Sequence, residues 1–186
     1  MTKVLMAPKK VFSLKILQSV EPQIADDLSV NIESLFNVDC TVDYTKLDLD
    51  FAFTRSRGQF NSTLILARMK EIISDEARAL LAIINDDLYA TGLNFVFGEA
   101  EVGGKAAIIS LARLRPTFWG EPDSIEKLKQ RARKEAIHEL GHVMGVNHCS
   151  NKRCVMFFSK TLEDTDKKSD RYCPDCAHLL AETLIK

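Results

Sequence analysis

The stretch His138–His148, with the sequence HELGHVMGVNH, decides how this chain must fold. His138 and His142 are one helical turn apart, about 6 Å along a helix axis, so both imidazoles leave the same face. On an uninterrupted helix His148 would lie about 15 Å from His138 and point elsewhere. Gly145 can end the helix with a positive φ because it has no Cβ. The stretch therefore predicts a helix, a turn at Gly145 and three converging histidines.

Three converging imidazoles favour a catalytic zinc site, since they leave the fourth tetrahedral position to water. Glu139 lies about 100° around the helix from His138, where it can contact that water without binding the metal. A chance set of histidines on a polar helix face is the alternative, and the five fixed positions disfavour it. We predict a zinc hydrolase with Glu139 as the general base. The predicted ligands are His138, His142 and His148.

Four of the five cysteines follow this stretch in the pattern C-x4-C and then C-x2-C. They are Cys149, Cys154, Cys173 and Cys176. Two close pairs of thiolates favour a structural zinc site. Two disulfides would need an oxidising compartment, and a thioredoxin-like pair would need a preceding strand. Because Cys149 follows His148 directly, the structural ion would also hold the third histidine in place.

The histidine stretch followed by a methionine resembles the metzincin clan of metalloproteases, and HELGHVMGVNHC with CVM and CPDC is similar to the archaemetzincin family. The segments RGQFN, DLYATGLNFVFGEA and IISLARL are similar to that family too. The resemblance implies a catalytic zinc on the histidines, a second zinc on the cysteines and Glu139 as general base. It also implies that Met156 is the Met-turn residue beneath the metal. Other metzincins usually have a different residue where this chain has Cys149.

Upstream of the histidines, hydrophobic patterning predicts alternating strands and helices. Strands are predicted at 11–17, 38–44, 79–84, 93–98 and 106–114, and helices after Pro22 and Asn61. Segments 93–98 and 106–114 flank the turn EVGGK and are expected to pair antiparallel. The long helix that carries the first two histidines is expected to start at Asp123, with Glu126 completing a capping box, and to end near Met144.

These elements predict an α/β (α+β) fold. With the resemblance, we expect a metzincin-like, mixed, twisted five-stranded sheet with one antiparallel edge strand, packed on the active-site helix. At 186 residues the chain suits a single metalloprotease domain, 1–186. Its N-terminal subdomain, 1–145, would contain the sheet and the active-site helix. Its C-terminal subdomain, 146–186, would contain the third histidine, the Met-turn and the cysteine zinc site, with loop and one short C-terminal helix as its only other structure. It is too short to bury a core without metal.

The segment before the EVGGK turn is expected to bind substrate. Leu93, Phe95 and Phe97 alternate towards one face between two glycines, as in a short edge strand. In metzincins, which this chain resembles, the strand before the last borders the cleft. An extended peptide is therefore expected to pair antiparallel with this edge. The residues expected to contact it are Asn94, Phe95, Val96, Phe97 and Gly98.

Charge and hydropathy exclude several partners. Lys and Arg number 25 against 26 acidic residues, a net charge of -1 that gives no global attraction to nucleic acid or to an anionic membrane. No apolar stretch approaches the roughly 20 residues needed to cross a bilayer. MTKVLMAPKKVFSLKIL contains no export signal, so we expect a cytoplasmic monomer. The basic cluster is expected to be a solvated helix face; it comprises Lys127, Lys129, Arg131, Arg133 and Lys134.

The expected function is zinc-dependent hydrolysis of peptide bonds in a peptide or protein substrate, with two zinc ions per chain, one catalytic and one structural. One alternative is a non-enzymatic zinc-binding interaction module with a vestigial active site. The intact Glu139 and the near-neutral charge argue against it. A second alternative is a zinc hydrolase of non-peptide amides, with which the histidine stretch is equally compatible.

Overall fold

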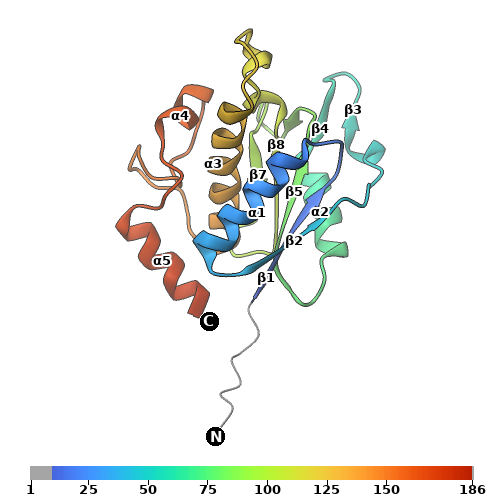
Figure 1. Cartoon of the computed structure of the whole chain (residues 1–186). Coiled ribbons are helices and arrows are strands. Elements are labelled where there is room, and N and C mark those ends of the chain that lie inside the picture. The colour runs from blue at the N-terminus through green and yellow to red at the C-terminus, as the bar shows by residue number, and fades with distance from the viewer. Residues whose placement is uncertain (1–9, 186) are drawn as a thin grey trace, which may run out of the picture.

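The structure of the chain, a computed structural model, describes residues 10–185. Residues 1–9 lie outside this range. They belong to the N-terminal segment MTKVLMAPKKVFSLKIL, for which the sequence analysis predicts no export signal. A five-stranded sheet forms the centre, in the order β2-β1-β5-β8-β7 (Figure 1). Its strands are β1 (Val11–Ile16), β2 (Asp39–Asp43), β5 (Ala77–Ile84), β7 (Gly98–Ala100) and β8 (Ala106–Ser110). The edge strand β7 is antiparallel to β8 and the other pairs are parallel, which confirms the predicted mixed sheet.

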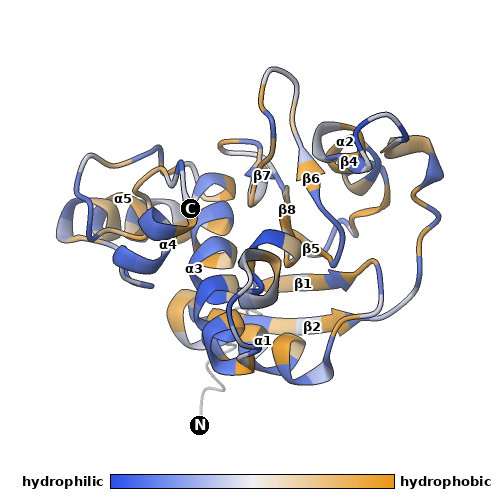
Figure 2. Ribbon diagram, turned by 90° about the horizontal axis from the view of Figure 1, so that it is seen from above, coloured by the Kyte–Doolittle hydropathy of each residue, from blue (hydrophilic) through white to orange (hydrophobic). Residues whose placement is uncertain are grey.

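The central strand β5 is buried on both faces. Residues 79, 81 and 83 enter one hydrophobic core and residues 80, 82 and 84 enter another, because successive side chains of a strand point to opposite faces. Helices α1 (Pro22–Phe36) and α3 (Ile125–Val143) pack in the first core, and α2 (Ser62–Ile72) packs in the second (Figure 2). The helices and strands therefore form the α/β arrangement that the sequence predicts.

Helix α3 begins one residue later than predicted. Its N-cap is Ser124, whose Oγ accepts a hydrogen bond from the backbone N–H of Lys127 at 3.3 Å. Glu126 is then the second residue of the helix, whereas a capping box needs the third, so the predicted box with Asp123 is wrong. The C-terminal end agrees with the prediction, since the helix stops at Val143 and Gly145 has a φ of 84°.

The predicted strand at 93–98 is wrong except for its last residue, Gly98. Side chains occupy the backbone acceptors that a strand would use: Nη2 of Arg57 and Nε2 of Gln59 donate to the carbonyl oxygen of Asn94 at 2.9 and 3.0 Å. The N–H of Val96 forms an isolated bridge with Leu88. The antiparallel partner of β8 is therefore the shorter β7, closer to the turn.

The predicted strand at 106–114 is too long, because β8 ends at Ser110. The hydroxyl of Ser110 donates to the carbonyl of Asp86 at 2.7 Å and accepts from the N–H of Ala112 at 3.1 Å, which turns the chain out of the sheet. Two 3-10 helices follow, η2 (Ala112–Leu114) and η3 (Pro116–Trp119). A small sheet that the sequence analysis missed contains β3 (Phe53–Thr54), β4 (Gln59–Asn61) and β6 (Leu88–Tyr89). Strands this short carry no readable periodicity.

The residues after Gly145 contain two helices, α4 (Leu162–Lys167) and α5 (Pro174–Ile185), of which only α5 was expected. Both lie on the side of α3 that faces away from the sheet (Figure 1). Thr161 caps α4 through a capping box with Asp164, a signal in the sequence that was overlooked. Among residues 10–185, no helix combines the length and apolar character that crossing a bilayer requires.

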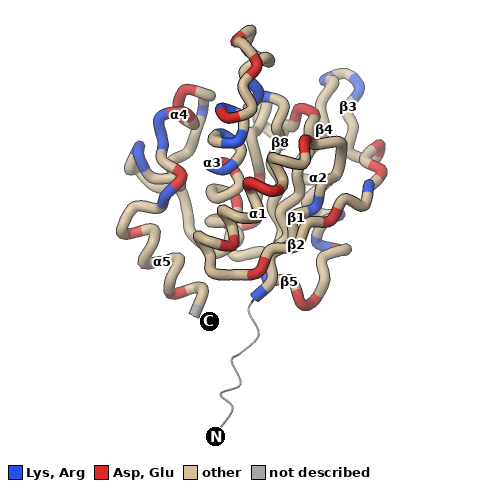
Figure 3. The backbone as a smooth tube through the Cα atoms, in the orientation of Figure 1, with Lys and Arg blue, Asp and Glu red and all other residues tan. Residues whose placement is uncertain are grey.

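The basic cluster appears as blue segments along α3 in Figure 3, and the predicted solvated face is wrong for most of it. Only Lys127 has a largely exposed side chain, at 57%. Arg131 is 3% exposed and forms two hydrogen bonds with the carboxylate of Asp166, at 2.7 and 2.8 Å. Lys134 donates to the carbonyl oxygen of Asp166 at 2.8 Å, and Arg133 bonds the carboxylate of Asp27 at 2.8 Å. Most of the polar face of α3 is covered because the C-terminal segment supplies Asp166 and α1 supplies Asp27 as partners for these cations.

Candidate metal centre and active site

Three histidines converge where α3 ends. His138 and His142 come from consecutive turns of α3, and His148 returns after the left-handed Gly145. One ring nitrogen from each lies within 4.8 Å of the others. The Nε2 atoms of His138 and His142 are 3.2 Å apart, close to the roughly 3.4 Å expected for two nitrogens bound to one tetrahedral zinc. This histidine cluster (His138, His142, His148) therefore fits the ion.

Backbone carbonyls set the orientation of the two helix histidines. Nδ1 of His138 lies 2.8 Å from the carbonyl oxygen of Val155, and Nδ1 of His142 lies 2.8 Å from that of Val146. A carbonyl only accepts, so Nδ1 carries the proton and Nε2 keeps its lone pair for a metal. Burial lowers the pKa of His142 to about 4 and that of His138 well below its usual value. Both imidazoles are thus held neutral, in the form that binds zinc.

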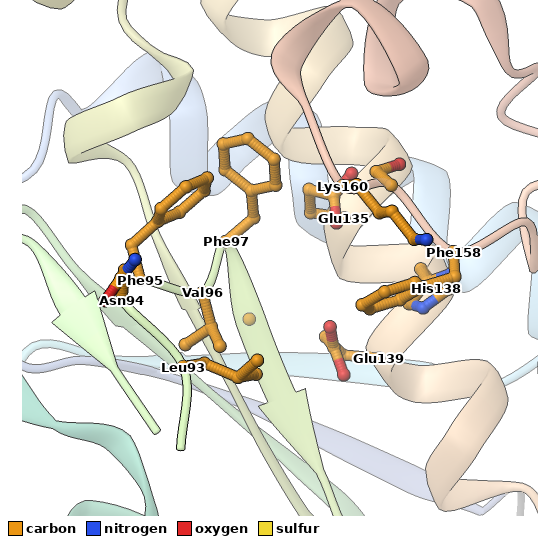
Figure 4. Close-up of a pocket in the computed structure, with 12 residues that line it drawn as sticks. Leu93, Asn94, Phe95, Val96, Phe97, Glu135, His138, Glu139, Phe158 and Lys160 are labelled. Carbon is orange, nitrogen blue, oxygen red and sulfur yellow. The ribbon is translucent and has the colours of Figure 1, made fainter. Parts of the chain in front are cut away.

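Glu139 is 5% exposed and points into the cavity beside His138 (Figure 4). Burial raises the pKa of its carboxyl well above the usual value, the carboxylates of Glu135 and Glu99 raise it further, and the ammonium group of Lys168 opposes them. Edge strand β7 packs directly on this side chain. A Cβ on Gly98 would lie 2.7 Å from Cγ of Glu139, so only glycine leaves room for the carboxylate.

The cavity has a volume of about 340 Å³ and lies between two walls (Figure 4). Residues 93–98 form one wall; His138 and Glu139 of α3 form the other, together with residues 158–160. The five residues expected to contact substrate, Asn94, Phe95, Val96, Phe97 and Gly98, all line it. Three backbone groups of this wall, Asn94 C=O, Val96 N–H and Phe97 C=O, already have partners within the chain and are not free to pair with an extended peptide.

Met156 is fully buried and packs against α3 at Gly141. A Cβ on Gly141 would lie 2.5 Å from Sδ of Met156 and 2.9 Å from the hydroxyl oxygen of Tyr172. That hydroxyl donates to the carbonyl oxygen of Ile137 at 2.9 Å. The glycine inside HELGH therefore permits two side chains of the C-terminal segment to touch the helix that presents the histidines.

The four late cysteines also converge, and all four sulfur atoms lie within 4.8 Å of one another. Sγ of Cys149 and Sγ of Cys173 are 3.8 Å apart, the separation of about 3.8 Å expected for two sulfurs on one tetrahedral zinc, and too long for a disulfide. Backbone N–H groups support them, since Cys173 N–H donates to Cys154 Sγ. A hydrogen bond from the backbone of Cys176 lowers the pKa of the Cys173 thiol. This cysteine cluster (Cys149, Cys154, Cys173, Cys176) fits a zinc ion as well.

A buried ion pair beside the histidine cluster was missed from the sequence. Nζ of Lys168 lies 3.0 Å from Oε1 of Glu135, and both side chains are almost fully buried, at 0 and 4% exposure. The hydroxyl of Thr165 donates to the same oxygen at 3.1 Å. Glu135 precedes Glu139 by one helical turn, so its position on the active-site face could have been inferred. Its partner could not, because Lys168 lies in a segment predicted to be loop.

Zinc metallopeptidases of the metzincin type share this plan, in which a helix presents two histidines and a glutamate beside a mixed sheet and a glycine returns the third histidine. The chain is a zinc metallopeptidase of this type. The profile of peptidase family M54 matches residues 48–182. An archaemetzincin of Methanocaldococcus jannaschii is 53% identical over 138 residues, which cover 74% of this chain and 75% of that protein.

Solved structures agree with this assignment. A crystal structure of archaemetzincin from Methanopyrus kandleri matches with a TM-score of 0.86 at 32% identity, and the match covers 98% of this chain and 99% of the other. Archaemetzincin from Archaeoglobus fulgidus matches with a TM-score of 0.78 at 36% identity, covering 91% and 99%. The chain belongs to peptidase family M54, the archaemetzincins.

Proposed function

We propose that the chain hydrolyses peptide bonds with Glu139 as general base, one zinc ion on the histidine cluster and a second on the cysteine cluster. The observation that carries the proposal is the position of Glu139, a buried carboxylate next to His138 at the base of an open cavity. The raised pKa of Glu139 makes it a stronger base than an exposed glutamate, as proton transfer from water requires.

A zinc ion on the histidine cluster would polarise the substrate carbonyl and lower the pKa of the attacking water. Glu139 takes the proton of that water on its carboxylate. It then returns the proton to the leaving amine, so that no covalent intermediate with the protein forms. Val155 and Val146 hold the imidazoles in one tautomer throughout, through their carbonyl oxygens. Met156 packs beneath the histidines as the Met-turn residue and keeps them in place.

The cysteine cluster would serve a structural zinc. Its four sulfurs come from both ends of residues 149–176, so one ion would close this loop. This supports a single domain, 1–186, with subdomains 1–145 and 146–186, the second depending on its metal. Four cysteines without a disulfide are most easily maintained where thiols are kept reduced, which favours the cytoplasm.

The substrate would lie against residues 94–98, with a side chain in the cavity and the scissile bond at Glu139. Because several backbone groups of this wall are already paired, side-chain contacts contribute more to binding than strand pairing does. Membership of family M54 and the cavity beside Glu139 favour this activity over a zinc module without catalysis. Hydrolysis of non-peptide amides would use the same catalytic groups. It is distinguished from peptide hydrolysis by testing both kinds of substrate.

The test is a peptide library incubated with the wild-type protein and with Glu139→Gln. The amide has the size of the acid but cannot accept a proton, so cleavage should fall by about two to four orders of magnitude while the zinc content stays the same. Glu126→Gln, on an exposed residue of the same helix, is the matched control and should cleave like the wild type. Cleavage by Glu139→Gln above a tenth of the wild-type rate would refute Glu139 as the base. Turnover of simple amides but of no peptide would refute the peptide substrate.

A further inference from the structure

A second cavity of about 370 Å³ adjoins the cavity beside Glu139. The two share Phe95 and Lys160 in their linings. None of the three clustered histidines is among the described residues that line the second cavity. His138 does line the first cavity, so the second cavity lies farther from the histidine cluster than the first. An extended chain bound at the histidines would meet both cavities on the same side of the cleaved bond.

The wall between the cavities is held rigid by an ion pair. The Arg113 guanidinium donates to both carboxylate oxygens of Asp87 at 2.7 Å, which fixes its orientation. Its Cζ lies 4.2 Å from the ring centroid of Phe95 and 5.0 Å from that of Phe118. These distances are within the range of cation–π attraction. These contacts therefore hold the Phe95 ring in one position in the absence of a ligand.

The side chain of Trp119 is also held in position by contacts within the chain. Its Nε1 donates to the carbonyl oxygen of Arg113 at 2.8 Å, and its ring packs 5.2 Å from that of Phe118. The side chain is still 44% exposed, and it lines the second cavity together with Leu162. A tethered tryptophan offers a large apolar surface with little conformational entropy to lose on binding.

The charged groups around the second cavity are mostly neutralised within the chain. Glu121 pairs with Lys127 at 3.0 Å, and Glu163 pairs with Lys167 at 2.5 Å. Lys160, on the ridge shared by the two cavities, has no ion pair among the described residues. Figure 4 shows its amino group directed towards the first cavity. The second cavity is therefore an apolar pocket reached past one positive charge.

We propose that this second cavity is a specificity pocket for the peptide substrate and that Trp119 determines its preference. The proposal rests on the proposed peptidase function. A good substrate carries two large apolar side chains on the same side of the cleaved bond, one for each cavity. In an extended chain, alternate side chains point the same way about 7 Å apart, which suits two adjoining pockets. The positive charge of Lys160 disfavours lysine or arginine at the substrate position that lies between the two cavities.

The experiment begins with one peptide that the wild-type protein cleaves. Each residue on both sides of the cleaved bond is changed in turn to alanine, and kcat/KM is measured with the wild type and with Trp119→Ala. One distal apolar position should lose about tenfold or more in the wild type, mostly through KM, and less than about threefold in Trp119→Ala. Trp119→Phe, which keeps an aromatic ring, should restore most of the discrimination.

Phe51→Ala is the matched control, because Phe51 is also an aromatic residue, is 50% exposed and lines neither cavity. It should keep the wild-type discrimination.

The same peptides are also titrated against Glu139→Gln with and without Trp119→Ala. The Kd values then measure the contribution of the pocket to binding without cleavage of the peptide. Equal discrimination with and without Trp119 would overturn the proposal, as would a wild type indifferent to every distal side chain. A wild type that neither cleaves nor binds any peptide would instead overturn the peptidase function on which the proposal rests.

Discussion

The histidine cluster and the cysteine cluster are adjacent in sequence, at His148 and Cys149, yet the chain supports them differently. Two of the three histidines lie on α3, a helix of 19 residues that packs on the sheet. Backbone carbonyl oxygens orient their imidazole rings. The cysteines lie in loops and at the start of α5, with Cys149 and Cys173 only partly buried. Secondary structure therefore positions two of the histidine donors before any metal binds, whereas the cysteine donors are brought together by tertiary contacts and, we propose, by the metal.

The largest effect should come from breaking the cysteine cluster. Cys173→Ser should destabilise the protein by several kcal/mol and expose residues 146–185 to protease, because the free energy of binding a structural zinc is also folding free energy. His142→Ala should lose one zinc and keep the fold, since its helix is stabilised by packing. Zinc content, thermal unfolding and limited proteolysis of the two variants distinguish the clusters. Equal loss of stability in both would contradict the difference between them.

A second large effect should come from the buried pair that joins the two regions. Lys168→Met leaves Glu135 buried without its cation and should cost about 3–5 kcal/mol in the free energy of unfolding. Adding Glu135→Gln removes the uncompensated charge and should recover most of that loss. Urea unfolding of the single and double variants measures both values. A double variant as unstable as Lys168→Met would show that packing, rather than charge, is lost.

The pH dependence of protein that holds zinc at the cysteine cluster but not at the histidine cluster should reveal the neutral histidines. The folded pKa of His142 is depressed to about 4 from 6.5, so the stability it contributes is fully present above pH 6.5 and is lost as the pH falls towards 4. The loss from this residue is about 3 kcal/mol, at 1.36 kcal/mol per pH unit. Denaturant unfolding between pH 7 and 4 should show a smaller loss in His142→Ala. His178→Ala, on an exposed surface of α5, should behave like the unmodified protein.

The smallest effect should come from removing the N-cap of α3, which tests how much this cap contributes to stability. Ser124→Ala should lower the free energy of unfolding by about 1 kcal/mol, because the N–H of Lys127 loses its acceptor. Asp123→Ala, one residue earlier, should have little effect, which distinguishes the observed cap from the predicted one. Both variants should retain two equivalents of zinc per chain. Thermal unfolding in the presence of zinc and metal analysis provide the two measurements.

Where the sequence alone is wrong, tertiary contacts are the cause. The alternation of Leu93, Phe95 and Phe97 predicts a strand, yet Arg57 and Gln59 bind the backbone acceptors of the segment from another part of the chain. Charges on α3 predict a solvated face, but Asp166 and Asp27 approach it from distant segments. No local pattern contains these partners, because they are brought together only when the chain has folded.

The sequence by itself determined the elements whose cause is local. Helical spacing brings His138 and His142 to one face, a glycine permits the turn before His148, and the apolar run 79–84 requires burial on both sides of a strand. Only the tertiary structure decided what surrounds them: the Glu135–Lys168 pair, the contact of Gly98 with Glu139, and the two cavities along the cleft. Donor spacing follows from helix geometry, whereas the shape and electrostatics of a cleft depend on which distant side chains pack against it.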